Sequence, residues 1–163
     1  MKIFKSQKNL KLYLNDISQD KTIGLVPTMG SLHQGHISLI NTARLHCDLV
    51  ICSIFVNPKQ FTNLNDFDNY PRDILSDIKK LEDINCDVLY SPEILDIYIE
   101  DEELEIFDFN GLDKYMEGIY RKNHFNGVAT IIKKLFTIID PDKAFFGEKD
   151  LQQLQIIKHI TES

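Results

Sequence analysis

The sequence Ile23-Gly24-Leu25-Val26-Pro27 is a short apolar run, and Thr28-Met29-Gly30-Ser31-Leu32-His33-Gln34-Gly35-His36 follows it directly. An amphipathic stretch comes next, so these residues predict a buried strand that turns into a helix. Backbone N–H groups at a helix N-terminus attract anions, glycine lets the backbone approach a phosphate closely, and imidazole adds donors. The two glycines and two histidines of this turn therefore predict a nucleotide-phosphate site.

Strands and helices alternate along the rest of the chain. Apolar residues at helical spacing predict helices near residues 6–19, 39–47, 71–84, 128–139 and 151–160. Short apolar runs between them predict strands at 22–27, 49–56, 87–90 and 143–146, and Leu104 with Ile106 suggests an edge strand. Such alternation is typical of βαβ units with right-handed crossovers. We therefore expect a Rossmann-like, doubly wound α/β fold: a mostly parallel sheet with helices on both faces.

Composition sets the class of protein. With 163 residues, of which 43% are hydrophobic and 26% charged, the chain is expected to form one soluble domain over residues 1–163. No apolar run reaches the length of a membrane span, and the first residues lack a signal-peptide core, so we expect a cytoplasmic protein without a membrane partner. The net charge of −7 argues against nucleic acid as the partner. Cys47, Cys52 and Cys86 show no ligand spacing and receive no function, and Cys52 is expected in the core.

Three polar clusters each follow a predicted strand: the turn 28–36, Asn57-Pro58-Lys59-Gln60-Phe61, and Gly147-Glu148-Lys149-Asp150-Leu151-Gln152-Gln153. The carboxyl ends of neighbouring parallel strands share one edge of a sheet, so we expect the clusters to meet there.

Each cluster also has a plainer interpretation. His36 could be a core histidine, the residues around Asn57 could simply form a turn, and Asp150 could cap the following helix. A metal site at the two histidines is possible, but no nearby Cys or Glu completes it. The acidic run 100–103 is expected to be a solvated loop, with metal binding a distant second.

The motifs resemble those of the pantothenate synthetase family, and the full set is far more specific than the HxGH turn alone. The matching stretches follow one another in order from near residue 20 to the end of the chain. They are Val26 to His36, Phe55 to Phe61, Tyr70-Pro71-Arg72, Met116-Glu117-Gly118, His124-Phe125-Asn126-Gly127-Val128, and Phe146 to Gln153.

The resemblance implies an enzyme that joins D-pantoate to β-alanine with ATP and Mg²⁺ through a pantoyl-adenylate intermediate. It implies that His36, His33 and Lys149 act on the phosphates, and that Asp77 binds magnesium. The implied substrate residues for pantoate and β-alanine are Gln60, Gln153, Asn57 and His124. The implied ATP-binding residues are Met29, Gly30, Ser31, Leu32, His33, Gln34, Gly35, His36, Gly147, Glu148, Lys149 and Asp150.

The resemblance also implies a homodimer and, in family members, a smaller C-terminal lid domain after this region. We expect the 163 residues to lack that lid and to turn over slowly or not at all. Two other functions stay open: a nucleotidyltransferase of the HxGH class that transfers AMP to a phosphorylated acceptor, and a non-catalytic nucleotide-binding module.

Overall fold

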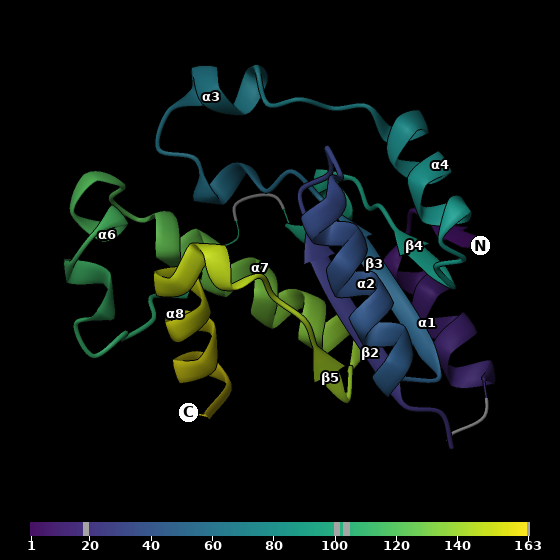
Figure 1. The fold of residues 1–163 in the computed structure, drawn as a ribbon. Coiled ribbons are helices and arrows are strands. Elements are labelled where there is room, and N and C mark those ends of the chain that lie inside the picture. Colours follow the sequence, from purple (N-terminus) through teal and green to yellow (C-terminus); the bar gives the residue numbers. More distant parts are fainter. Residues whose placement is uncertain (18–19, 100–101, 103–104, 163) are drawn as a thin grey trace.

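Parallel strands form the centre of the computed structural model, which describes residues 1–17, 20–99, 102 and 105–162. Within these residues the sheet has five strands in the order β1-β4-β3-β2-β5, and every neighbouring pair is parallel (Figure 1). This confirms the predicted doubly wound α/β fold. The strands are β1 (Lys2–Phe4), β2 (Ile23–Thr28), β3 (Leu49–Ile54), β4 (Val88–Tyr90) and β5 (Lys143–Ala144).

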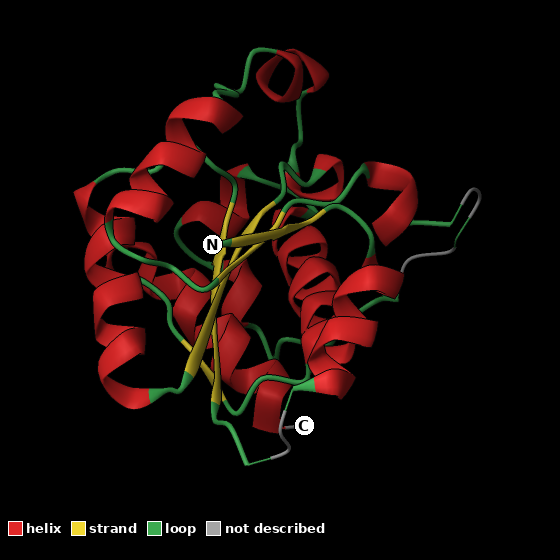
Figure 2. Ribbon diagram, turned by 90° about the vertical axis from the view of Figure 1, so that its right-hand side faces the viewer, coloured by secondary structure: helices red, strands yellow, loops and turns green. Residues whose placement is uncertain are grey.

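Helices cover both faces of the sheet, and Figure 2 shows the strands between two groups of helices. On one face α2 (Gln34–His46) and α4 (Ile74–Asp83) pack on the sheet, and on the other face α1 (Gln7–Asp16), α7 (His124–Ile139) and α8 (Leu151–Glu162) do so. The shorter helices are α3 (Leu64–Asp68), α5 (Ile94–Ile97), α6 (Glu117–Tyr120), η1 (Pro58–Gln60), η2 (Leu112–Lys114) and η3 (Glu148–Asp150). None of the helices in the described ranges is long and apolar enough to cross a bilayer.

The apolar pattern of the chain explains the core. All six residues of β3 are buried, as a continuous apolar run between two helical layers requires. Cys52 is fully buried within it, as expected, and Cys86 is buried beside it in the same apolar cluster. The strongest helical pattern, from Val128 to Ile139, forms the buried part of α7.

The sequence prediction missed β1, made β3 and β5 two residues too long, and placed an edge strand near Ile106. Ile3 is 44% exposed, so this edge strand carries no apolar run that could reveal it. β5 ends at Ala144, two residues earlier than expected. The predicted edge strand near Ile106 is wrong at that residue, which is 90% exposed and outside any strand, and Leu104 lies outside the described residues.

The segments that follow β2 and β5 determine where a crevice forms at the edge of the sheet. β2 leads into α2 on one face, and its neighbour β5 leads through η3 into α8 on the other face. Two adjacent parallel strands whose following helices diverge leave a crevice at their carboxyl ends. The turn 28–36 and the segment Gly147–Asp150 both begin at this crevice.

Ser53 gives a test of the packing in β3. Its hydroxyl has no hydrogen-bond partner, alone among the buried side-chain nitrogen and oxygen atoms of the described residues. Because a buried hydroxyl without a partner keeps only its desolvation cost, we expect Ser53→Ala to raise the free energy of unfolding by about 1 kcal/mol. Urea denaturation measures this change, and a less stable variant would contradict the assignment.

The matched control is Thr28→Val. The Thr28 hydroxyl donates to the Ser53 carbonyl at 2.8 Å and accepts from the Gly30 N–H at 3.1 Å. Removing it is expected to lower the free energy of unfolding by about 1 kcal/mol, the opposite direction.

Candidate functional site

The two histidines of the turn cap the helix that follows them. His33 is the N-cap of α2, and its Nδ1 accepts from the Gly35 N–H at 3.0 Å. The His36 Nδ1 accepts in return from the His33 N–H at 3.3 Å, so the pair forms a reciprocal capping box. The two rings lie close together, with centroids 4.1 Å apart. His36 is therefore not a core histidine, the plainer interpretation of the sequence, because its ring is half-buried and bonded to the turn itself.

This capping fixes the tautomer of both rings. A ring nitrogen that accepts a hydrogen bond carries no proton, so the neutral rings of His33 and His36 carry theirs on Nε2. Burial and the neighbouring His33 lower the pKa of His36, although Asp77 acts in the other direction. The pair therefore offers neutral Nε2–H donors to a ligand. It is suited to stabilising negative charge by hydrogen bonding rather than to releasing a proton.

Five backbone amides of the turn, those of residues 30–33 and 35, already have partners within the chain. The Ser31 and Leu32 N–H groups donate to the two carboxylate oxygens of Asp77, each at 2.8 Å. The Gly30 N–H donates to Thr28, and those of His33 and Gly35 donate to the imidazoles. The sequence pattern predicts that these amides face a phosphate, whereas in this structure they hold the shape of the turn. The imidazole Nε2–H groups remain as donors.

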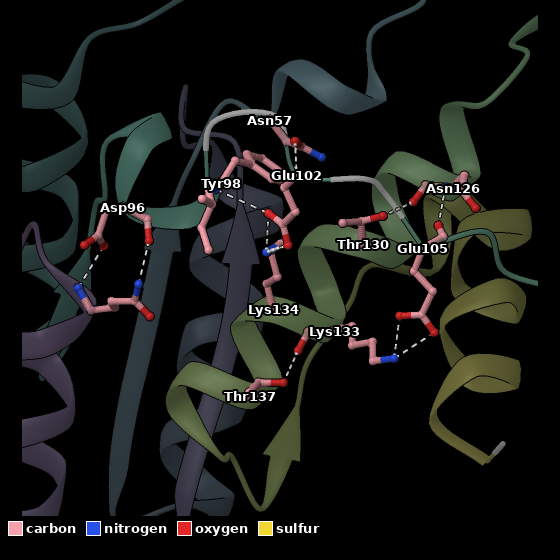
Figure 3. A network of polar contacts seen from close by, with 12 residues as sticks. Asn57, Asp96, Tyr98, Glu102, Glu105, Asn126, Thr130, Lys133, Lys134 and Thr137 are labelled. Atoms are coloured by element: carbon pink, nitrogen blue, oxygen red, sulfur yellow. Dashed lines mark hydrogen bonds and ion pairs between the residues drawn. The ribbon is translucent and has the colours of Figure 1, made fainter.

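Asn57 holds Gln60 in one orientation. Asn57 is fully buried, and its Nδ2 donates to the Gln60 Oε1 at 3.2 Å and to the Gly127 carbonyl at 3.0 Å. Its Oδ1 accepts from the Tyr98 hydroxyl at 2.7 Å, a contact visible in Figure 3. Because Oε1 of Gln60 is occupied, Nε2 is the end of this amide that points away from Asn57. It donates to the sulfur of Met29 at 2.8 Å, which links this cluster to the turn.

His124 carries its ring proton on the other nitrogen than His33 and His36 do. It is 4% exposed, and its Nδ1 lies 2.7 Å from the carbonyl oxygen of Gln60. A carbonyl only accepts, so Nδ1 carries the proton and the neutral ring keeps Nε2 as an acceptor. Burial lowers the pKa of His124, and the Gln60 carbonyl partly offsets this. Four of the predicted residues, Met29, Asn57, Gln60 and His124, thus form one connected cluster.

The third cluster lies at the same edge of the sheet and is open. Glu148, Lys149 and Asp150 form η3 and are exposed, and a Cβ added to Gly147 would meet nothing within 4 Å. Asp150 is the last residue of η3 and directly precedes α8. The two glutamines that follow, Gln152 and Gln153, differ in burial.

Gln152 is buried and ties α8 to the loop before it. Its Nε2 donates to the Leu112 and Tyr115 carbonyls, and its Oε1 accepts from the Glu117 N–H. Gln153 is half-buried in the first turn of α8. The family resemblance implies that Gln153 binds substrate. Its neighbour Gln152 instead holds α8 against the preceding loop.

A cavity of about 630 Å³ adjoins the turn. Met29, Gly30 and Asp77 line it together with residues of α4 and α5 and apolar residues from the end of β3. Among the described residues, Gln60, Asn57, His124 and Gln153 do not line it. The cavity therefore lies next to the turn and does not gather the predicted substrate residues.

The sequence analysis did not single out three residues that shape the site. Tyr98 donates to Asn57, and Lys80 donates to the Leu32 carbonyl at 2.8 Å. Gly127 lets α7 approach η1: a Cβ there would lie 2.7 Å from the Gln60 Cα and closer still to the Lys59 carbonyl. Two signals pointed to such a contact: Gly127 directly precedes the strongly apolar helical pattern 128–139, and it belongs to one of the stretches that match the family.

The acidic run 100–103 is described only at Glu102. This carboxylate bonds the Lys134 ammonium at 2.7 Å and 2.9 Å, which lowers the pKa of Glu102. Figure 3 shows this pair close to Tyr98, whereas the ion pair of the neighbouring Lys133 with Glu105 lies farther from Tyr98. Among the described residues, no group of three or more His, Cys, Asp or Glu is arranged to hold a metal ion.

The lowered pKa values of His36 and His124 predict a loss of stability in acid. The unfolded histidines take up a proton near pH 6.5, above the pKa values in the folded chain, so the unfolded state binds more protons below that pH. We therefore expect the free energy of unfolding to fall as the pH drops from about 7.5 to about 5.5.

Urea denaturation at the two pH values measures the drop in the wild type and in His124→Asn. The asparagine amide can still donate to the Gln60 carbonyl but does not titrate, so its drop should be smaller. Carboxylates contribute equally to both chains, and an equal drop in the two would contradict the assignment.

Comparison with known proteins gives the same match throughout. The family described as pantoate-beta-alanine ligase matches residues 2–163. A protein named pantothenate synthetase from Christiangramia forsetii is 49% identical over 164 residues, and one from Aquifex aeolicus is 47% identical over 161 residues. The alignments cover 99% and 98% of this chain, but the chain spans only 58% and 57% of the length of these relatives.

Solved structures agree. The pantoate-beta-alanine ligase of Francisella tularensis, described as complexed with beta-gamma ATP and beta-alanine, superimposes with a TM-score of 0.96 at 41% identity. The match covers 99% of this chain and 62% of that one. The pantothenate synthetase of Thermus thermophilus gives a TM-score of 0.92 at 35% identity, with coverage of 99% and 57%.

Proposed function

Since this chain belongs to the pantoate-beta-alanine ligase family, we propose that it takes part in the ATP-dependent joining of pantoate to β-alanine. In the first step a pantoate carboxylate oxygen attacks the α-phosphorus of ATP, and the bond from that phosphorus to pyrophosphate breaks. In the second step the β-alanine amine attacks the acyl carbon of the pantoyl adenylate, the bond to AMP breaks, and the amine loses a proton. Residues 1–163 would form the ATP- and pantoate-binding domain of this system.

One observation carries the proposal. The HxGH turn, the Asn57–Gln60 cluster and the Gly147–Asp150 segment follow β2, β3 and β5 of one parallel sheet, at the edge where the helices after β2 and β5 diverge. The 41%-identical relative from Francisella tularensis, described with beta-gamma ATP and beta-alanine bound, supports both ligands for this chain.

The phosphates would be held by donors and positive charge. The Nε2–H groups of His33 and His36 would donate to phosphate oxygens, and the exposed Lys149 would add a mobile cation. Phosphoryl chemistry depends chiefly on positioning and on the stabilisation of charge. For that task a neutral donor held by a helix cap is sufficient, and we assign His36 this role rather than that of a proton donor.

Pantoate would bind beside Met29. The Gln60 Nε2 now donates to a sulfur, which is a weak acceptor, so a carboxylate or hydroxyl oxygen of the substrate would be a better partner. Gln153 would contact the same substrate, and the Nε2 of His124 would accept from a hydroxyl or an ammonium group. Asn57 would act on pantoate through Gln60, since its own polar atoms are already bonded.

Magnesium would arrive with ATP. Asp77, the residue expected to bind it, accepts from two backbone amides, lies beside the Lys80 ammonium and belongs to no group of three or more His, Cys, Asp or Glu that could hold a metal ion among the described residues, so the residues present do not fit a protein-held ion there. The homodimer and the cytoplasmic location stay predictions.

Pantoate-dependent exchange of labelled pyrophosphate into ATP tests the function. We expect slow exchange with pantoate and none with a phosphorylated acceptor. Calorimetry should show that Lys149→Ala weakens ATP binding and that Gln153→Ala weakens pantoate binding.

The matched controls are Lys158→Ala and Gln155→Ala, exposed positions on α8, which should bind as the wild type does. Exchange with the phosphorylated acceptor alone would favour a nucleotidyltransferase. ATP binding without binding of pantoate or any exchange would favour a non-catalytic module.

A further inference from the structure

Asp77 lies directly beneath the phosphate-binding turn. It belongs to the first helical turn of α4, is 2% exposed, and places one carboxylate oxygen on the Ser31 N–H and the other on the Leu32 N–H, each at 2.8 Å. A Cβ added to Gly30 would lie 3.1 Å from the Asp77 Oδ2, so the carboxylate packs against the backbone of the turn itself.

The turn needs such support. Gly30 and Ser31 have φ angles of +84° and +52°, two successive residues in the left-handed region. Glycine adopts it freely, but serine does so at a cost that its surroundings must offset. The two charge-assisted hydrogen bonds from the Ser31 and Leu32 amides to Asp77 offset this conformational cost, because charge-assisted bonds are stronger than neutral ones.

A cation already stands beside this carboxylate. The Lys80 ammonium lies 3.8 Å from the Asp77 Oδ1 and donates to the Leu32 carbonyl at 2.8 Å. The N-terminal end of α4 further favours the negative charge. Magnesium prefers several oxygen ligands in near-ideal octahedral geometry, whereas this carboxylate is 2% exposed, already accepts from two amides and has an ammonium 3.8 Å from one oxygen.

We propose that Asp77 is a positioning residue that fixes the conformation of the turn 28–36 and, through it, the two histidines, and that it is not a magnesium ligand. The inference rests on the proposed function only in taking this turn as the phosphate site. Lys80 completes the support from the same helix by holding the carbonyl that follows the two anchored amides.

Paramagnetic NMR on the wild-type chain tests the metal directly. Mn²⁺ added without nucleotide should leave the amide signals of Ser31, Leu32 and Ser76 unbroadened at concentrations that saturate an ATP complex. Selective broadening of these three signals would place a metal at Asp77 and overturn the proposal. This measurement needs no variant to fold and no activity.

The variant Asp77→Asn tests the positioning. An asparagine accepts from one amide but turns its own NH₂ group toward the other. The amide signals of Ser31 and Leu32 should shift and lose protection from hydrogen exchange, and affinity for a non-hydrolysable ATP analogue should fall about tenfold or more. The Mg²⁺ concentration for half-maximal binding of the analogue should not change. If Asp77→Asn kept the wild-type amide signals of Ser31 and Leu32 but needed more Mg²⁺ for half-maximal binding of the analogue, the positioning role would be wrong.

Asp73→Asn is the matched control. It makes the same charge change at the N-cap of the same helix, where the Asp73 carboxylate accepts from the Ser76 N–H and not from an amide of the turn. It should keep the Ser31 and Leu32 signals and the affinity for the analogue. A failure of the proposed function would instead appear as absent pantoate-dependent exchange while these NMR results hold.

Discussion

Gly127→Ala is expected to lower the free energy of unfolding by about 3 kcal/mol, the upper end of the cost of overpacking. The added methyl group would lie 2.7 Å from the Gln60 Cα and closer still to the Lys59 carbonyl, and both are backbone atoms that cannot rotate away. To relieve the clash α7 must move from η1, which also breaks the bond from Asn57 to the Gly127 carbonyl. Urea denaturation measures the loss, and calorimetry should show weaker pantoate binding because Gln60 is displaced.

Gly147→Ala is the matched control for stability. Its Cβ would meet nothing within 4 Å, and its φ of −75° suits any residue, so the free energy of unfolding should stay within about 0.5 kcal/mol. Equal stability of Gly127→Ala and the wild type would show that α7 and η1 do not approach this closely.

His36→Ala is expected to reduce pantoate-dependent ATP–pyrophosphate exchange by about 10² to 10³-fold, the range for losing one preorganised donor to developing charge. The variant loses the Nε2–H and also the acceptor for the His33 N–H. ATP affinity, measured by calorimetry, should fall as well.

His36→Gln separates the two losses. Glutamine at this position of a capping box can accept from the N-cap amide, so the helix start and the stability should recover. The exchange rate should stay low because the imidazole donor is missing. Wild-type exchange in His36→Gln would show that the ring contributes only to the cap.

The strands and long helices were predictable because burial between two layers leaves a strong apolar pattern. β3 and α7 show this most clearly. β1 was not predictable, since this edge strand has three mostly exposed residues and is held by pairing with β4, far away in the sequence. The helices α3, α5 and α6 have four or five residues each, too few for a helical period to show.

The site was predictable in its residue types and not in its internal bonds. The glycines and histidines of the turn indicated a phosphate site, but the backbone amides of Ser31 and Leu32 between them donate to Asp77, which is 46 residues from Ser31 in the sequence. In the same way Asn57 looked like a residue that contacts a ligand, and it is instead buried and bonded to Tyr98 and Gln60. Such long-range partners leave no local pattern.

The place of β1 at the far edge of the sheet has a consequence for the order of assembly. Lys2–Phe4 pairs only with Val88–Tyr90 among the described strands, and β4 in turn needs β3 beside it. A ribosome makes β1 first, yet this segment must wait until β2, β3 and β4 have emerged before it can pair. Folding during synthesis would therefore begin at the β2–β3 pair, beside the HxGH turn, and β1 would join the sheet only after β4 has emerged.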